Sequence, residues 1–506
     1  MAKSFLLGVD IGTLGSKGVV VDPEGRVLAQ HFCEHDVLHP KPGWAEHDPE
    51  QTWWGDFVRI TQALLAQPDI EPEAIAAVCV SGLIPDLAPT DGEGQPLRNA
   101  ILYSDNRALE EIQYVNQLFG TQLTSEEITP KLLWFLRHEP DLFARTRMIF
   151  NAHSYVVYKL TGQYTIDYLT ACLFGAIYAT SRAEWREDAC RQLGIPIEIL
   201  PPPHPPAQVV GEVTKTAAEQ TGLAQNTPVL AGSGDVYFSL LGAGVTEPGE
   251  VMIYYGTAGL TTLCHCSLEY LARKPYSIDD GFPFSYPAYM LTSGELVHWF
   301  RDQFGTCEAE VAKWLSRSAY QLLDEEAAQI PPGSEGLILL PYFLGQRSPV
   351  FDPLARGVFF GLSMSHTRAH LYRAILESYG YGIRHGLEET ASRGQDVRLK
   401  RVVATGGGAR SSLWRQIVSD IVGIAQEYIS RADAPLADAY LAGYGVGLFS
   451  DFETMRREWL EVTSVTQPRM DIHLQYQPFY EIYRDLHQSL RDHFVALDRA
   501  MGGISA

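Results

Sequence analysis

The chain has 506 residues, enough for two or three domains with a large buried core. Its 39 basic and 61 acidic residues give a net charge of -22, which argues against nucleic acid or an anionic membrane as the main partner. Seven scattered cysteines without a CxxC pair favour reduced thiols, and the first apolar run is too short for a signal peptide or a membrane span. We therefore expect a soluble, acidic, cytoplasmic protein.

The first predicted elements form a glycine-rich hairpin. Between two short apolar runs, the stretch GVDIGTLGSKGVVV (8–21) carries three turn residues, Gly12, Thr13 and Gly15. It fits neither GxxxxGK[ST] nor GxGxxG followed by a helix, because β-branched and apolar residues come next. The pattern predicts strand, tight turn and strand, with Asp10 on the first strand and a third antiparallel strand over 26–32. Backbone N–H groups in such a turn can approach a phosphate, since glycine has no Cβ.

Helical and strand patterns alternate after this hairpin. Apolar residues at helical spacing predict a helix over 48–66, and IAAVCVSG (75–82) is typical of a buried strand. The proline cluster over 199–211 is interpreted as a rigid surface connection. A helical stretch is predicted over 478–499. The alternation indicates the α/β class.

A weak internal repeat appears near the middle of the chain. The stretch EVMIYYGTAGLTTLC (250–264) again places Gly-Thr-x-Gly between two strand-like runs, so YGTAG matches IGTLG. One match would indicate only an ordinary hairpin, but two matches half a chain apart, each at the start of a series of strands, indicate a repeated unit. The repeat predicts an N-terminal lobe, 1–245, and a C-terminal lobe, 246–506.

Three longer motifs carry a family resemblance. The segments AGSGDVYFSLLGAG (231–244), GVFFGLSMSHTRAHLYRAILES (357–378) and ATGGGARSSLWRQIVSDIVG (404–423) resemble the aspartate segment, the long signature and the adenine and phosphate loop of the FGGY carbohydrate kinases. The resemblance extends from residue 6 to about residue 450 with the motifs in the family's order. It implies two actin-like (ribonuclease H-like) ATPase lobes with a central cleft that holds sugar and nucleotide.

Two carboxylates are candidates, one for proton transfer and one for metal binding. Phosphoryl transfer needs positioning, charge neutralisation and an acceptor for the hydroxyl proton. By resemblance the proton acceptor is Asp235 of the GSGD segment; the ordinary alternative, a helix N-cap, is compatible with that role. Asp10 suits magnesium, which binds one or two carboxylates together with phosphate oxygens and water. The alternative for Asp10 is a turn-stabilising aspartate.

The predicted nucleotide contacts lie in three glycine-rich turns, and the resemblance implies ATP and Mg²⁺ as ligands. The residues are Gly12, Thr13 and Gly15 in the first hairpin, Gly256 and Thr257 in the second hairpin, and Gly406, Gly407 and Gly408 in the third turn. The last turn lies between a predicted strand, RVVAT, and a predicted helix, so its N–H groups would face an anion at a helix N-terminus.

The sugar contacts are where the chain departs from its family. Xylulose-phosphorylating members carry SGQMHG, whereas this chain has SGLIPD over 81–86, with leucine and proline at the glutamine and histidine positions. Ser81 and Asp86 are the candidate substrate residues of this loop, and an exposed loop aspartate is the alternative for Asp86. Asp105 and Arg107 match the family's Asp-x-Arg as further substrate candidates. The alternative for them is a purely structural ion pair.

The predicted function is ATP-dependent phosphorylation of a small sugar, with a ketopentose such as D-xylulose, converted to its 5-phosphate, as the favoured substrate. Kinases for ribulose, glycerol or a tetritol share the class and differ only in the pocket. An actin-like or chaperone-type ATPase would lack the FGGY motifs, and a non-catalytic sugar sensor would lack the base. The sequence leaves open the sugar, any effector, and whether the chain forms a homodimer.

Overall fold

The structure, a computed structural model, describes residues 4–276, 283–392 and 399–502. Its chain divides into two compact units: unit 1 holds Met1–Thr246, Ser267–Pro283 and Asp433–Leu460, and unit 2 holds the rest. The chain first leaves unit 1 beside the predicted boundary at 245, but it returns twice. The predicted division at one position does not include these returns. In the second return, a helix from the C-terminal half of the chain covers the sheet of unit 1.

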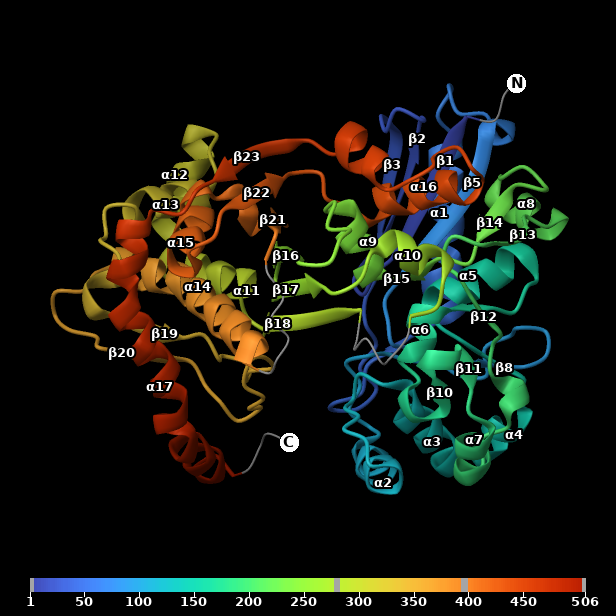
Figure 1. The fold of residues 1–506 in the computed structure, drawn as a ribbon, viewed down its shortest axis with the longest axis horizontal. Coiled ribbons are helices and arrows are strands. Elements are labelled where there is room, and N and C mark those ends of the chain that lie inside the picture. The colour runs from blue at the N-terminus through green and yellow to red at the C-terminus, as the bar shows by residue number, and fades with distance from the viewer. Residues whose placement is uncertain (1–3, 277–282, 393–398, 503–506) are drawn as a thin grey trace. The chain divides into compact units, whose positions relative to one another are not determined.

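Unit 1 is built on a mixed sheet (Figure 1) in the order β13-β14-β5-β1-β2-β3, with β15 also paired to β5. The three N-terminal strands form the predicted antiparallel meander, and β5 and β14 continue the sheet in parallel with β1. The strand bounds are β1 Phe5–Ile11, β2 Gly15–Val21, β3 Val27–Glu34, β5 Ile75–Gly82, β13 Val209–Glu212, β14 Pro228–Leu230 and β15 Ser233–Gly234.

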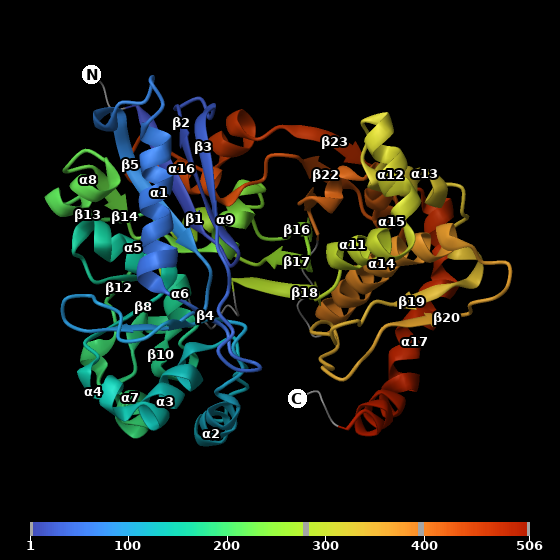
Figure 2. The ribbon, with the colours of Figure 1, turned by 180° about the vertical axis from the view of Figure 1, so that it is seen from behind.

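Helices cover both faces of this sheet, α16 on one and α1 on the other (Figures 1 and 2). Leu7, Val9 and Ile11 of β1 belong to the same buried cluster as the aromatic residues of α1 and the turn before it. Because side chains alternate along a strand, Gly8 and Asp10 face the other side, toward α16. The main helices are α1 Gly55–Leu65, α5 Ala152–Thr161, α8 Lys215–Thr221, α9 Asp235–Gly242 and α16 Ala434–Gly445.

Smaller elements complete unit 1 around a second buried cluster that includes Leu132, Phe135 and Phe174. Its further helices are α2 Leu109–Phe119, α3 Ile128–His138, α4 Pro140–Arg145, α6 Tyr168–Cys172, α7 Glu187–Leu193 and α10 Leu268–Arg273. The predicted helix over 48–66 is confirmed as a π-helical turn, Pro49–Trp54, followed by α1. The proline-rich connection over 199–211 runs into the edge strand β13.

Unit 2 has a six-stranded sheet in the order β18-β17-β16-β21-β22-β23. Its first three strands are again an antiparallel meander, and β21 and β22 extend the sheet in parallel with β16, as β5 and β14 do in unit 1. The bounds are β16 Glu250–Tyr255, β17 Gly259–Cys264, β18 Phe284–Met290, β21 Arg401–Thr405, β22 Gln426–Ile429 and β23 Val462–Thr466. The shared strand arrangement confirms the α/β class and agrees with the repeated unit predicted from the two Gly-Thr turns.

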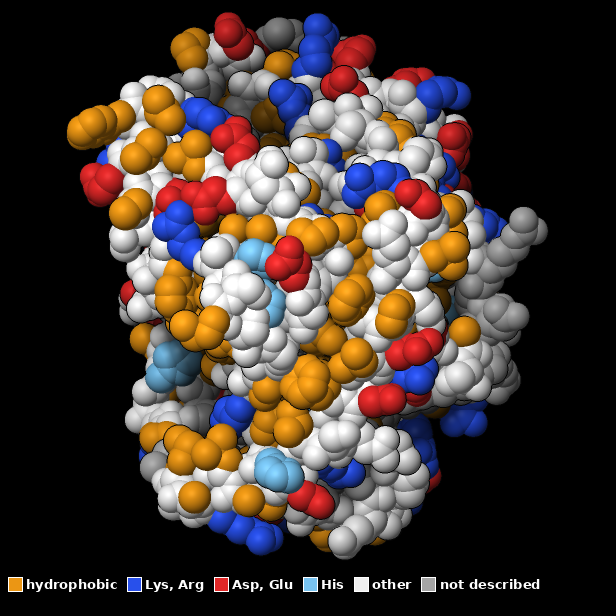
Figure 3. Space-filling model, turned by 90° about the vertical axis from the view of Figure 1, so that its left-hand side faces the viewer, with side chains coloured by type: hydrophobic (Ala, Val, Ile, Leu, Met, Phe, Trp, Pro, Cys, Tyr) orange, Lys and Arg blue, Asp and Glu red, His pale blue; other side chains and the backbone are white. Residues whose placement is uncertain are grey.

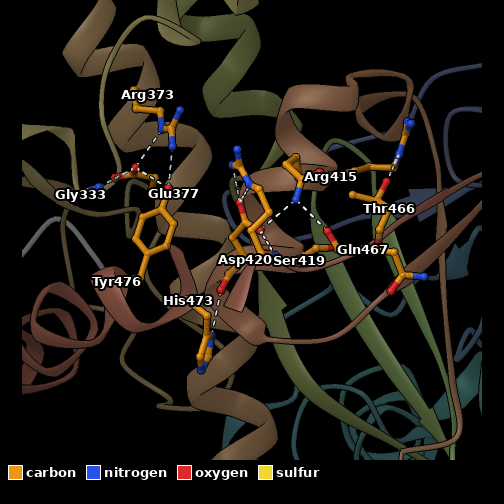
Figure 4. A network of polar contacts seen from close by, with 12 residues as sticks. Gly333, Arg373, Glu377, Arg415, Ser419, Asp420, Thr466, Gln467, His473 and Tyr476 are labelled. Atoms are coloured by element: carbon orange, nitrogen blue, oxygen red, sulfur yellow. Dashed lines mark hydrogen bonds and ion pairs between the residues drawn. The ribbon is translucent and has the colours of Figure 1, made fainter. Parts of the chain in front are cut away.

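A buried polar network (Figure 4) attaches the C-terminal helix α17, Met470–Ala500, to α14, Arg368–Ser392, and α15, Ser412–Val422. Tyr476 Oη donates to Glu377, which also accepts from Arg373, and His473 Nδ1 contacts the backbone oxygen of Asp420. These contacts involve the first turns of α17, which begins at Met470, before Pro478. The prediction that the helix starts at 478 was therefore wrong at its N-terminus.

The remaining helices of unit 2 are α11 Gly294–Phe304, α12 Thr306–Leu315 and α13 Ala319–Ala327, and the hairpin β19 Ile338–Leu340 with β20 Val358–Phe360 lies outside the main sheet. Figure 3 shows hydrophobic side chains gathered on the face of this unit that is on the left in Figure 1. Exposed apolar residues at the end of β20 and directly after it include Phe360, Leu362 and Met364. None of the helices in the described part of the chain is long and apolar enough to span a membrane.

Candidate active site

Strand register brings the predicted base and the predicted metal ligand to neighbouring strand ends in unit 1. Asp10 on β1 pairs with Ser81 on β5, and Ser81 pairs with Ser233 on β15. Asp235 follows two residues later as the first residue of α9, whose N-cap is Gly234. The alternative, in which Asp235 is the N-cap of this helix, was therefore wrong by one residue. The row of paired strands explains why residues more than two hundred positions apart share one site.

Ser81 connects two carboxylates in this site. Its hydroxyl oxygen lies 2.8 Å from Asp10 Oδ1 and 2.8 Å from Asp438 Oδ2. Asp438, on α16, did not appear among the sequence-predicted site residues. The signal that could have identified it is an aspartate inside an otherwise apolar helix, LADAYLAG, but only the fold shows which strand that helix covers.

The site contains one fully buried carboxylate, Asp438, and two partly buried ones, Asp10 and Asp235. Burial, and next the charge of Asp10, raise the pKa of Asp235 to about 7. Burial also raises the pKa of Asp10 to about 6, against the lowering effect of the Ser81 hydrogen bond, and raises the pKa of Asp438 well above its usual range. Lys17, on β2, pairs with Asp433. The site therefore favours a proton or a bound cation.

The first Gly-Thr turn is confirmed as the tip of the β1–β2 hairpin. Gly12 N donates to Gly15 O at 3.2 Å, and the backbone oxygen of Thr13 lies 3.1 Å from His47 Nε2. Burial, and next the neighbouring His35, lower the pKa of His47 to about 4, so this imidazole is neutral at pH 7. Because Trp53 Nε1 donates to His47 Nδ1, the remaining N–H is on Nε2 and donates to Thr13 O. His47 thus stabilises the backbone of this turn through the oxygen of Thr13.

The other predicted nucleotide residues lie in unit 2. Gly256 and Thr257 form the β16–β17 turn, and their backbone oxygens accept from the start of α11. The glycines 406–408 follow β21, and Gly406 has φ +93°, a conformation that glycine adopts without strain. Ser411 then caps α15 by accepting from Trp414 N. The predicted order of strand, glycine turn and helix is confirmed for this segment.

Asp86 is fully buried, so the interpretation as an exposed loop aspartate was wrong. Its carboxylate accepts from Asn151 Nδ2 and from Ala152 N, at 3.2 and 2.9 Å, and thereby holds the start of α5. The SGLIPD loop also packs on the segment of the predicted base: a Cβ on Gly234 would lie 2.0 Å from Ile84 Cδ1. The contact of Asp86 with a sugar stays a prediction.

Asp105 and Arg107 form a buried ion pair, with Arg107 Nη2 2.7 Å from Asp105 Oδ2. Arg107 also pairs with Glu46 and stacks over Trp44, with its guanidinium carbon 3.7 Å from the ring centre. Asp105 accepts from Ala45 N at 2.7 Å. These contacts match the structural alternative, and the substrate contact of the pair stays a prediction.

Two family models match long segments of the chain. The model of the N-terminal domain of the FGGY family of carbohydrate kinases matches residues 5–242, and that of its C-terminal domain matches residues 267–439. The chain is 28% identical over 505 residues to a xylulose kinase of Bacillus subtilis, covering 97% of this chain and 98% of the relative.

Two further relatives are similar over their whole length. A gluconokinase of Bacillus subtilis is 27% identical over 516 residues, with 98% of each chain covered. The crystal structure of a xylulose kinase from Rhodospirillum rubrum superimposes with a TM-score of 0.83 at 28% identity, covering 97% of this chain and 99% of that one. The relatives thus include enzymes named for two different acceptors.

Proposed function

Because the chain belongs to the FGGY family of carbohydrate kinases, we propose that this sugar kinase transfers the γ-phosphoryl group of ATP to a ketopentose, D-xylulose, and forms its 5-phosphate. The family establishes ATP-dependent sugar phosphorylation on two actin-like lobes. The xylulose kinases among the relatives support the choice of acceptor. We infer a cytoplasmic location as well, which the seven free cysteines support.

The observation that carries the proposal is Asp235 at the start of α9, next to the end of the strand that bears Ser81. A partly buried carboxylate whose pKa lies near 7 can accept the proton of the sugar hydroxyl. The hydroxyl oxygen then bonds to the γ-phosphorus while the bond to the ADP oxygen breaks. Asp235 holds the transferred proton until product leaves.

Asp10 is the proposed magnesium ligand. No three His, Cys, Asp or Glu side chains of the described residues are grouped as a ready metal site, which agrees with an ion that takes one or two carboxylates and completes its shell with phosphate oxygens and water. Burial raises the pKa of Asp10 to about 6 although the Ser81 hydrogen bond and the charge of Lys17 lower it, so a bound cation would stabilise the ionised form. When bound, Mg²⁺ neutralises phosphate charge as the phosphoryl group moves.

The glycine turns are the proposed phosphate contacts, each within its own unit. In unit 1 the phosphate contacts would come from Thr13 and Gly15. In unit 2 they would come from Gly256 and Thr257, and the turn over 406–408 would hold the nucleotide at the start of α15. Gly12 N already donates to Gly15 O, so its contact with a phosphate requires an exchange of partner.

An acceptor panel tests the proposal. We expect ADP release with MgATP and D-xylulose, and comparable turnover of a second ketose or polyol, because SGLIPD lacks the glutamine and histidine side chains that would select hydroxyls. The panel contains D-xylulose, D-ribulose, D-gluconate, glycerol and erythritol. Asp235→Asn protein, purified in parallel, measures the background from contaminating kinases.

The panel separates the alternatives. If D-xylulose is inert and another acceptor reaches ordinary turnover, the choice of xylulose is wrong and the kinase assignment stands. If every acceptor is inert although the protein binds ATP, the chain is a sugar-binding sensor. An Asp86→Ala variant that raises the sugar KM and leaves the ATP KM unchanged would support a sugar contact for Asp86.

The pH dependence of the reaction tests the role of Asp235. Since the pKa of Asp235 lies near 7, kcat/KM for the sugar at low MgATP should fall by about tenfold per pH unit below 7 and level off above it. The measurement runs from pH 5.5 to 9, with unfolding checked at each pH. A flat profile over this range would contradict a base with this pKa.

The homodimer considered from the sequence stays a prediction. The exposed apolar residues next to β20 support a surface for self-association. The mass in solution, measured by light scattering, decides between one and two chains.

A further inference from the structure

The carboxylate of Asp438 has a place in unit 1 that its own helix does not explain. Asp438 is the fifth residue of α16, so it does not cap the helix, and Asp433 occupies the N-cap position. Its side chain is fully buried against β1, where a Cβ on Gly8 would lie 2.7 Å from Asp438 Cβ. A buried carboxylate costs stability unless it is paired or hydrogen-bonded.

The partners of Asp438 are few. Oδ2 contacts the Ser81 hydroxyl at 2.8 Å, and Oδ1 is buried without a hydrogen-bond partner among the residues that the structure describes. Within the same described ranges, Asp438 forms no ion pair, and the nearby Lys17 of β2 pairs with Asp433. Ser81 is therefore the contact through which Asp438 can act.

The number of protons on the Ser81 hydroxyl limits which groups can donate in its two hydrogen bonds. A serine hydroxyl has one proton, yet Ser81 Oγ lies 2.8 Å from both Asp10 Oδ1 and Asp438 Oδ2. If Ser81 donates to Asp10, its second contact requires a donor on Asp438. Two hydrogen-bond chains satisfy both distances, one from Asp438 through Ser81 to Asp10 and the other in reverse. Only the first, in which the Asp438 carboxyl donates to Ser81 and Ser81 donates to Asp10, leaves Asp10 ionised as a magnesium ligand must be.

We propose that Asp438 is a positioning residue that acts through Ser81 to hold the Asp10 carboxylate in the orientation that receives magnesium. The hydrogen bond from α16 keeps the Ser81 rotor directed at Asp10 Oδ1, so Asp10 meets the metal with one oxygen already fixed. This inference rests on the proposed function, in which Asp10 is the magnesium ligand. It assigns a donor role to Asp438, which an asparagine can reproduce and an apolar residue cannot.

The test measures ADP binding by calorimetry, once with Mg²⁺ and once with EDTA, so it does not depend on turnover. Wild type should bind ADP more tightly with Mg²⁺. We call the ratio of ADP affinity with Mg²⁺ to ADP affinity in EDTA the magnesium gain. It should fall about tenfold in Asp438→Leu and in Ser81→Ala and stay near the wild-type value in Asp438→Asn. ADP affinity in EDTA should be unchanged in all three variants. Combining Ser81→Ala with Asp438→Leu should add nothing to Ser81→Ala alone, because both act through one contact.

Thr61→Val is the matched control, since Thr61 is a fully buried hydroxyl on α1 that bonds its own helix. It should lower stability without changing the magnesium gain. Should Asp438→Leu fail to fold, Asp438→Asn and Ser81→Ala still decide the matter. An Asp438→Asn variant that loses the gain would overturn the donor role, and a Ser81→Ala variant that keeps it would overturn the relay.

The kinase assay separates this inference from the proposed function. If wild type phosphorylates no acceptor but the magnesium gain follows the predicted order, the proposed function fails and the positioning role stands. If wild type is an active kinase and the gain is equal in all variants, the positioning role is wrong.

Discussion

Asp235→Asn should lower kcat for sugar phosphorylation by about 10³-fold and leave the binding of ADP within a factor of about three, because the change removes the proton acceptor without altering the glycine turns. The comparison uses single-turnover rates at saturating sugar and MgATP, together with calorimetry of ADP. Retained turnover within about tenfold of wild type would leave Asp235 with a structural role at the start of α9.

A stability measurement tests whether the loss of activity in Asp235→Asn comes from a loss of folding. The pKa of Asp235 is raised to about 7 in the folded chain from an ordinary 3.8, so its ionised form opposes folding above pH 7 and this cost disappears below about pH 4. Asp235→Asn should therefore unfold a few degrees higher than wild type at pH 8. The two Tm values should converge as the pH is lowered toward 4.

Gly8→Ala should destabilise unit 1 by about 3 kcal/mol, the second large effect that the structure predicts. A Cβ at this position would lie 2.0 Å from Pro435 O and 2.5 Å from Ala439 N, so α16 must move away from β1. Backbone atoms cannot rotate out of the way as a side chain can. The same movement would separate Asp438 from Ser81, so the magnesium gain in ADP binding should fall as well.

Gly92→Ala is the control for this change. Its Cβ would meet only Arg147 Cγ at 3.8 Å, an ordinary contact, and Gly92 is exposed. The midpoint of urea unfolding should shift clearly for Gly8→Ala and hardly at all for Gly92→Ala. Equal midpoints for the two variants would contradict the close packing of α16 on β1.

Much of the site was predictable because its parts are local in sequence. The two Gly-Thr turns join strands that pair with their neighbours along the chain, and such hairpins depend on residues a few positions apart. The glycine turn over 406–408 likewise lies between a strand and a helix that local patterns indicate. Asp10 was selected because it lies just before the first Gly-Thr turn, and Asp235 because it belongs to the contiguous GSGD segment.

The SGLIPD loop and the Asp-x-Arg pair were harder to interpret from the sequence. Whether Asp86 is exposed or buried depends on Asn151 and Ala152, which lie 65 and 66 residues further along the chain. Arg107 likewise takes its second carboxylate, Glu46, from a segment 61 residues away. Composition at the loop itself contains no information about these partners.

The sequence by itself determined the α/β class, the two hairpins and the family, because periodicity and contiguous motifs record local structure and chemistry. It also selected Asp235 as the predicted base. Only the tertiary structure decided that α16 returns to cover the first sheet and places Asp438 against Ser81, 357 positions away in the chain. The physical reason is that a buried carboxylate is defined by what surrounds it. Its partners, its burial and therefore its pKa come from packing between segments whose separation no local pattern records.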